Sequence, residues 1–167
     1  MNKNNKILIL NSGGTFNKIY NQLNGQLEIQ QNNQNIKQIL ESSKISDCKV
    51  DSILYKDSLD INSKDRAKII NYIQKSNFKK IIIIHGTDTI NKTAKLIKKK
   101  IFDKTIVLTG AMLPFSINPI EATANLIGAY SFIKYKNKKD IYISMHGNTK
   151  KYNKIKKNRT LGIFECQ

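Results

Sequence analysis

Several residue types are scarce in this chain of 167 residues, and each scarcity excludes a class of protein. Tryptophan is absent, and there are only two cysteines, two histidines, two prolines and eight glycines. Cys48 and Cys166 lie far apart, and neither has a Cys or His at the spacing of metal ligands. A disulfide framework needs more cysteines than this, and a zinc site needs more Cys and His ligands at suitable spacing. We therefore expect unpaired cysteines and no bound metal.

Long apolar runs are also lacking. No segment approaches the roughly 20 apolar residues that a membrane span requires. The run Ile7–Leu10 is too short for a secretion signal, and the Asn-Ser-Gly-Gly that follows it is not a cleavage site. A hydrophobic content of 40% is typical of a globular protein, and this length corresponds to one domain with a proper core. The sequence predicts a cytoplasmic protein with a single domain, residues 1–167, and no membrane contact.

Acidic residues are few, with 12 Asp and Glu against 29 Lys and Arg, which gives a net charge of +17. Such a charge attracts nucleic acid. The lysines are spread along the chain, however, among many Asn and Ile residues, whose codons are also rich in A and T. The densest segments, 134–139 and 150–159, contain no known nucleic-acid-binding signature. We therefore expect solvated lysines on helix faces, with nucleic-acid binding as the weaker alternative.

The hydrophobic pattern alternates between strands and helices. Short apolar runs predict strands at 6–11, 50–55, 80–84, 105–109 and 141–145, with a short final one at 161–164. Helical spacing predicts helices at 33–43, 62–75, 91–101 and 119–135. The run at 80–84 has no polar alternation, which is typical of a strand covered on both faces. The pattern predicts a three-layer α/β domain of the Rossmann or flavodoxin type, with a mostly parallel sheet flanked by helices.

Small and polar residues follow the predicted strands. In chain order these residues are Gly13–Thr15, then Asp57, Ser58 and Asp60, then His85–Thr89, then Gly110–Met112, and finally His146–Asn148. Ligands of such sheets bind beyond the carboxyl ends of the strands. Residues of this kind, gathered at one edge, are typical of a site for a polar small molecule.

Three familiar sites are excluded, because the sequence lacks the dinucleotide-binding glycine pattern, the P-loop and the serine nucleophile elbow. Two threonines, Thr15 and Thr87, remain, with Asp88 beside the second. A threonine hydroxyl acts as a nucleophile when a base takes its proton and N–H groups stabilise the oxyanion. The alternatives are structural, since Thr15 can cap a turn or helix, and Asp88 can cap the helix near Thr89.

Three segments together carry a family resemblance, namely Gly13–Phe16, His85–Thr89 and Val107–Met112. In this order, each after a predicted strand, they resemble the asparaginase/glutaminase family of threonine amidohydrolases. The resemblance runs from about residue 6 to residue 164. Full-length members are about twice as long and have a second, smaller domain, so the chain resembles their amino-terminal catalytic domain.

The chain also resembles the short, single-domain bacterial members of that family. The segments that carry this likeness are Gly14–Asn21, Lys56–Leu59, Lys156–Arg159 and Gly162–Glu165. On this basis we expect a complete chain that lacks the usual carboxyl-terminal domain. Because most family members are dimers or tetramers, the resemblance implies a homo-oligomer. It implies no metal and no organic cofactor.

The resemblance also implies a role for each matching residue. Thr15 would be the nucleophile, and Tyr20 would assist its proton transfer from a mobile loop. Thr87 would position the attacking group or water, activated through Lys157, with Asp88 as the neighbouring acid. The substrate-binding residues would be Gly14, Ser58, Thr87, Asp88 and Ala111, of which Asp88 binds the α-ammonium, Ser58 the α-carboxylate, and the Ala111 backbone lines the amide pocket.

The function expected from the sequence is hydrolysis of the side-chain amide of L-asparagine to aspartate and ammonia. The alternative is a catalytically weak or inactive module of the same fold that binds an amino acid or amide. An enzyme releases ammonia from the amide. A binding module would gain thermal stability from its ligand without releasing ammonia.

Overall fold

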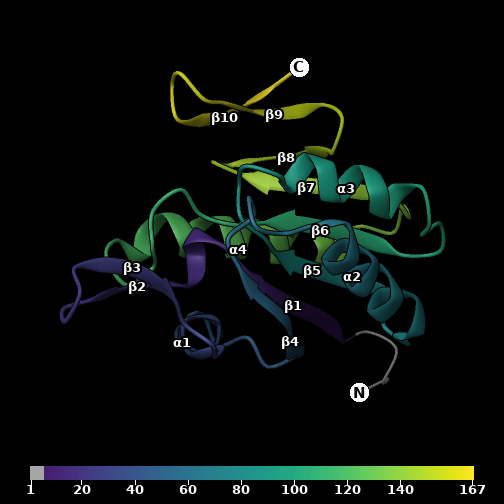
Figure 1. Ribbon diagram of the computed structural model, residues 1–167. Helices are drawn as coiled ribbons and strands as arrows, with labels where there is room; N and C mark the ends of the chain where they lie inside the picture. The colour runs from purple at the N-terminus through teal and green to yellow at the C-terminus, as the bar shows by residue number, and fades with distance from the viewer. Residues whose placement is uncertain (1–5) are drawn as a thin grey trace.

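A six-stranded sheet forms the centre of the computed structural model, which describes residues 6–167 (Figure 1). The strand order is β4-β1-β5-β6-β7-β8, in which the first five strands are parallel and β8 is antiparallel to β7. The strands are β1 (Ile7–Gly13), β4 (Cys48–Lys56), β5 (Lys80–Ile84), β6 (Thr105–Thr109), β7 (Ile141–Met145) and β8 (Asn148–Lys151). The predicted mostly parallel sheet is confirmed.

Helices cover both faces of the sheet. They are α1 (Gln34–Ser42), α2 (Ser63–Lys75), α3 (Ile90–Lys98) and α4 (Pro119–Tyr135), together with the short 3-10 helix η2 (Thr15–Asn17). Helices α2 and α3 pack on one face, and α1 and α4 pack on the other. The predicted three layers are confirmed.

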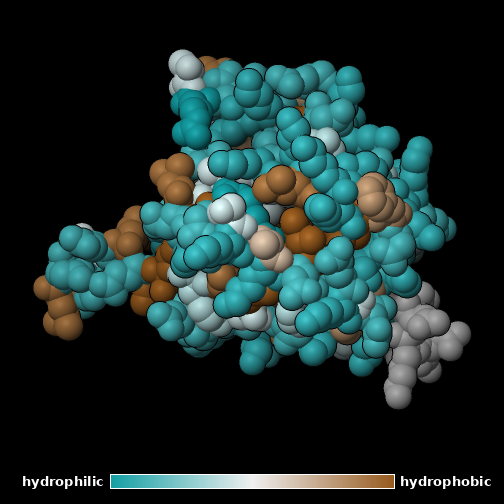
Figure 2. All heavy atoms as spheres, turned by 45° about the vertical axis from the view of Figure 1, so that its right-hand side comes forward, coloured by the Kyte–Doolittle hydropathy of each residue, from teal (hydrophilic) through white to brown (hydrophobic). Residues whose placement is uncertain are grey.

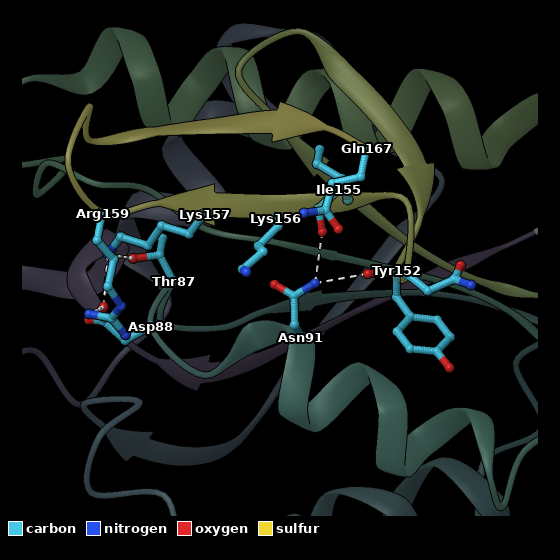
Figure 3. A pocket seen from close by; sticks show the side chains of 10 residues that line it. Thr87, Asp88, Asn91, Tyr152, Ile155, Lys156, Lys157, Arg159 and Gln167 are labelled. Atoms are coloured by element: carbon cyan, nitrogen blue, oxygen red, sulfur yellow. Dashed lines mark hydrogen bonds and ion pairs between the residues drawn. The ribbon is translucent and has the colours of Figure 1, made fainter.

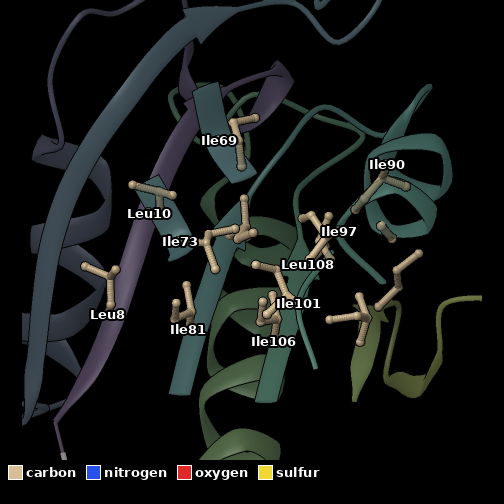
Figure 4. Close-up of a cluster of buried hydrophobic side chains, with 14 of the residues drawn as sticks. Leu8, Leu10, Ile69, Ile73, Ile81, Ile90, Ile97, Ile101, Ile106 and Leu108 are labelled. Carbon is tan, nitrogen blue, oxygen red and sulfur yellow. The ribbon is translucent and has the colours of Figure 1, made fainter. Parts of the chain in front are cut away.

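The buried strands divide their side chains between two hydrophobic clusters. Leu8 and Leu10 pack in the cluster under α2 and α3 (Figure 4), whereas Ile7 and Ile9 face α1 and α4. Residues 81–84 are fully buried and alternate between the same two clusters. Successive side chains of a strand point to opposite faces. A strand in the middle of a three-layer domain is therefore apolar throughout.

Two hairpins lie outside the central sheet (Figure 1). They are β2 (Lys18–Asn21) with β3 (Gln26–Ile29), and β9 (Ile155–Asn158) with β10 (Ile163–Cys166). The expectation that segment 150–159 lies on a helix face is wrong, because it forms the end of β8, a turn and β9. Ile155 and Phe164 are buried in the cluster under α3 and anchor the second hairpin.

Side-chain caps account for two helix boundaries. The Asn62 side chain accepts a hydrogen bond from Asp65 N, and Asp65 accepts one from Asn62 N, which forms a capping box at the start of α2. Asn118 caps α4, where Pro119 occupies the first turn. Helix α4 has the bounds that the sequence predicts.

The strand order reverses direction at β1. The chain passes from β1 to β4 on one side and then to β5 on the other, so the carboxyl ends of β1 and β5 lie at the switch point where such sheets bind ligands. Most of the face shown in Figure 2 is hydrophilic, as the abundance of lysine leads one to expect. No helix within residues 6–167 is long and apolar enough to cross a bilayer.

Candidate active site

Two glycines bring the loops after β1 and β5 into direct contact. Gly14 has a φ of 84°, a conformation that side-chain-bearing residues rarely adopt. A Cβ at Gly14 would lie 2.5 Å from the Cα of Gly86, so only glycine fits between the two loops. Thr15 follows at once and begins η2. The contact therefore holds Thr15 next to the segment that carries Thr87.

The loop after β4 packs against the same point. A Cβ at Gly86 would lie 2.6 Å from the Ser58 Cβ, so this glycine also allows a close approach. Ser58 is buried, and its Oγ has no hydrogen-bond partner within the described residues. Three loops thus meet at the switch point, and one of them holds a buried hydroxyl that can still donate.

Lys157 reaches this edge from β9, about 70 residues farther along the chain. Its Nζ donates to Thr87 Oγ1 over 3.0 Å and to Asp88 Oδ1 over 2.9 Å. The Lys157 side chain is 15% exposed, and Thr87 is buried. A threonine hydroxyl, a carboxylate and an amine in contact can pass protons between one another.

Arg159, for which the sequence predicts no role, binds the same carboxylate. Its guanidinium lies 2.8 Å from Asp88 Oδ1, so one oxygen of Asp88 receives two cations. Arg159 extends from the loop between β9 and β10, next to Lys157 (Figure 3). The rarity of arginine is a signal that could have identified Arg159, because only two of the 29 basic residues are arginines.

A cavity of about 250 Å³ opens beside this cluster. Asn91, at the start of α3, donates from its side chain to the Tyr152 and Ile155 carbonyls, each over 2.8 Å, and so fastens α3 to the turn before β9 (Figure 3). The cavity is lined by Thr87, Asp88, Asn91, Tyr152, Asn153, Ile155, Lys156, Lys157, Arg159 and Gln167.

The other arginine, Arg66 of α2, is buried beneath the site loops. It donates to the Ile61 carbonyl, to Thr93 Oγ1 over 3.0 Å and to Thr89 Oγ1 over 3.0 Å. Thr89 in turn donates to the Ser58 carbonyl over 2.8 Å. Arg66 therefore ties the Ser58 loop to the start of α3.

His85 is a structural member of the same network. Its Nδ1 lies 2.8 Å from the Gly86 carbonyl, and its Nε2 lies 2.9 Å from Thr93 Oγ1. Because the Gly86 carbonyl can only accept, we assign the proton to Nδ1; Nε2 then accepts from the Thr93 hydroxyl, which itself accepts from Arg66. Complete burial lowers the pKa of His85 to about 4, so the ring is neutral at pH 7.

A second polar group supports the loop after β6. The Glu121 carboxylate accepts from the Met112 and Leu113 backbone N–H groups over 2.8 and 3.0 Å. It also accepts from His146 Nε2 over 3.0 Å, while His146 Nδ1 accepts from Phe164 N over 3.1 Å. These contacts join the loops after β6 and β7 to the second hairpin.

The two remaining predicted site residues are Ala111 and Tyr20. Ala111 follows Gly110, where a Cβ would lie 3.7 Å from Thr87 Cγ2. Ala111 is fully buried and packs with Phe16, the residue after Thr15. Tyr20 is 56% exposed on β2, and its hydroxyl lies close to the turn at Gly25. No hydrogen bond joins Tyr20 to Thr15 in the described part of the chain. Within residues 6–167 there is also no group of three or more His, Cys, Asp or Glu placed to hold a metal ion.

Comparison with known proteins identifies a matching family and similar folds. Residues 6–164 match the family model described as Asparaginase, N-terminal. The thermostable L-asparaginase from Thermococcus kodakarensis superposes with a TM-score of 0.81 and 27% identity, over 96% of this chain and 51% of that protein. The probable cytoplasmic L-asparaginase from Campylobacter jejuni superposes with a TM-score of 0.80 and 22% identity, over 96% of this chain and 52% of that protein.

The chain therefore spans about half the length of these two structures. No curated protein sequence matches it.

Proposed function

Because the chain belongs to the asparaginase family, we propose that it hydrolyses the side-chain amide of L-asparagine to aspartate and ammonia, with Thr15 as the nucleophile. The observation that supports this most strongly is the contact of Lys157 with both Thr87 and Asp88, next to the loop that bears Thr15. Residues so distant in sequence form a proton-transfer group at the switch point of the sheet.

In the first step the Thr15 hydroxyl oxygen attacks the amide carbon. The bond from that carbon to nitrogen breaks, and ammonia leaves with the proton that the hydroxyl gave up. An ester of Thr15 remains. The backbone around Gly14 and Ala111 lines the amide end of the substrate, where N–H groups stabilise the oxyanion.

In the second step a water molecule held at Thr87 attacks the ester. Thr87, which Lys157 holds in place, takes a proton from this water and passes a proton on to the departing Thr15 oxygen. Aspartate leaves and the threonine is restored. Asp88 orients Lys157, and it also attracts the substrate ammonium. The unpartnered hydroxyl of Ser58 is available to donate to the substrate carboxylate.

Ammonia release from L-asparagine, L-glutamine and an asparaginyl dipeptide tests this proposal. We expect release from L-asparagine that Thr15→Ala and Thr87→Ala each abolish. Thr123→Ala is the matched control, because Thr123 is half-buried on α4, outside the cluster, and this variant should retain full activity. Folded protein that releases no ammonia, yet is stabilised by L-asparagine, would instead support the binding module.

We also propose that the active form is a homodimer or homotetramer, in which a neighbouring subunit covers the substrate. The cluster around Asp88 is half-exposed, so a second surface is needed to exclude water from it. Sedimentation velocity at the concentrations used for the activity assay tests this, and an active monomer would contradict it.

A further inference from the structure

The charged groups around the site do not balance. The Asp57 carboxylate, beside Ser58, is paired with Lys18 over 2.7 Å. The Asp88 carboxylate, beside Thr87, is paired with both Lys157 and Arg159. In these ion pairs three cations face two carboxylates, and Lys156 lines the same cavity, so positive charge is in excess where the substrate must bind.

Arg159 is the cation in excess that contacts Asp88. Lys157 is already sufficient to neutralise Asp88, and it also contacts Thr87. Arg159 contacts Asp88 alone among the described acidic side chains, and its own side chain is 66% exposed. A guanidinium stays charged at every pH at which proteins are stable and holds a carboxylate in a fixed geometry. Arg159 therefore always competes with a ligand cation for Asp88 Oδ1.

Free L-asparagine carries a carboxylate and an ammonium. Its ammonium needs an anionic partner, and Asp88 is the carboxylate that contacts the proton-transfer group. At that position the ammonium meets the guanidinium of Arg159 and must either displace it or bind beside a like charge. An amide with a carboxylate and no ammonium meets no such repulsion, and its negative charge offsets the excess positive charge.

We infer that Arg159 makes the site prefer amides that carry a carboxylate but no free α-ammonium over free L-asparagine. Such compounds are asparagine with an acylated α-amine, and succinamate, which lacks the amine altogether. This inference rests on the proposed function and defines its substrate class. In it Arg159 is a specificity-determining residue, whereas Thr15 and Thr87 act on the amide group common to all these substrates.

Calorimetric titration of the Thr15→Ala protein, which cannot hydrolyse its ligand, measures this preference directly. The probes are L-asparagine, N-acetyl-L-asparagine and succinamate. We expect succinamate and the acetylated amide to bind more tightly than L-asparagine. In the double variant Thr15→Ala, Arg159→Gln the ratio of the dissociation constants should shift by about tenfold toward L-asparagine, the size expected for one partly solvated charge pair.

Lys154→Gln is the matched control, because it removes one positive charge from the turn before β9 without touching Asp88. It should leave the ratio unchanged. Binding of the products L-aspartate and succinate to the unaltered protein provides a second measurement that does not depend on the Thr15 variant. A ratio that Arg159→Gln does not change, or the absence of binding by all probes, would overturn the inference.

The two proposals can fail separately. If no ammonia is released but the ratio of dissociation constants still depends on Arg159, the proposed hydrolysis is wrong and the proposed preference for carboxylates is supported. If ammonia is released but the ratio of dissociation constants does not depend on Arg159, the proposed hydrolysis is supported and the inference about Arg159 is wrong.

Discussion

Replacement of Arg66 by leucine tests whether a buried arginine holds the site loops together. Arg66 is 3% exposed and donates to the Ile61 carbonyl and to the hydroxyls of Thr93 and Thr89. Leucine keeps much of the apolar contact and removes all three donors. The Ile61 carbonyl then has no hydrogen-bond donor. The Thr93 hydroxyl keeps its partner His85, and the Thr89 hydroxyl keeps the Ser58 carbonyl.

The expected cost follows from these contacts. A buried acceptor left without a donor costs about 1–3 kcal/mol, and hydrogen bonds to a charged group contribute about 1.5–3 kcal/mol each. Removal of the buried charge offsets part of this loss, because burial disfavours the guanidinium and lowers its pKa. We therefore expect Arg66→Leu to lower the free energy of unfolding by about 3 kcal/mol in urea denaturation.

Lys68→Leu is the control, since Lys68 is exposed on the same helix and has the same charge. It should change the free energy of unfolding by less than about 0.5 kcal/mol. A loss below about 1 kcal/mol for Arg66→Leu would refute the argument that the network stabilises the fold. If the network positions the loops, the Michaelis constant for the amide should also rise in Arg66→Leu and stay unchanged in Lys68→Leu.

Three further predictions concern single residues. Gly86→Ala should lower the free energy of unfolding by about 1–3 kcal/mol in urea denaturation, because its Cβ would clash with Ser58. Gly128→Ala in α4, whose Cβ would meet only a hydroxyl oxygen at 3.5 Å, should leave the free energy of unfolding unchanged or raise it. His85 has a pKa of about 4 when folded and 6.5 in its unperturbed form, so the unfolded chain binds its proton first as the pH falls. The free energy of unfolding should decrease by up to about 3 kcal/mol from pH 7 to pH 4, and His85→Asn should remove that part of the slope; an unchanged slope would contradict the assignment. Lys157→Met should lower the rate of ammonia release by about 100-fold or more, and equal rates in Lys157→Met and Lys154→Met would contradict its role in holding Thr87 for proton transfer.

The central sheet could be predicted because its strands are buried on both faces. Residues 81–84 lie between two layers of helices and are all apolar, so this run stands out from a lysine-rich sequence. The polar residues that follow each strand were also predictable, because parallel strands end at one edge. Contact between the Gly14, Ser58 and Gly86 loops agrees with that expectation.

The two hairpins could be predicted only in part. The short strand expected at 161–164 overlaps β10, whereas β2, β3 and β9 have few buried residues and no alternation that would reveal them. The segment 155–158 is a strand only because Ile155 and the distant Phe164 find room under α3. The contacts of Arg159 and Arg66 could not be predicted for the same reason. They join residues that are far apart in the chain, and the sequence shows only that arginine is rare.

Formation of a hydroxamate tests the central claim, a covalent ester on Thr15, most directly. Hydroxylamine competes with water for such an ester, so the protein incubated with L-asparagine and hydroxylamine should form aspartate β-hydroxamate together with ammonia. We expect both products from the unaltered protein and neither from Thr15→Ala. Ammonia release that persists in Thr15→Ala, or release without any hydroxamate, would contradict the threonine mechanism.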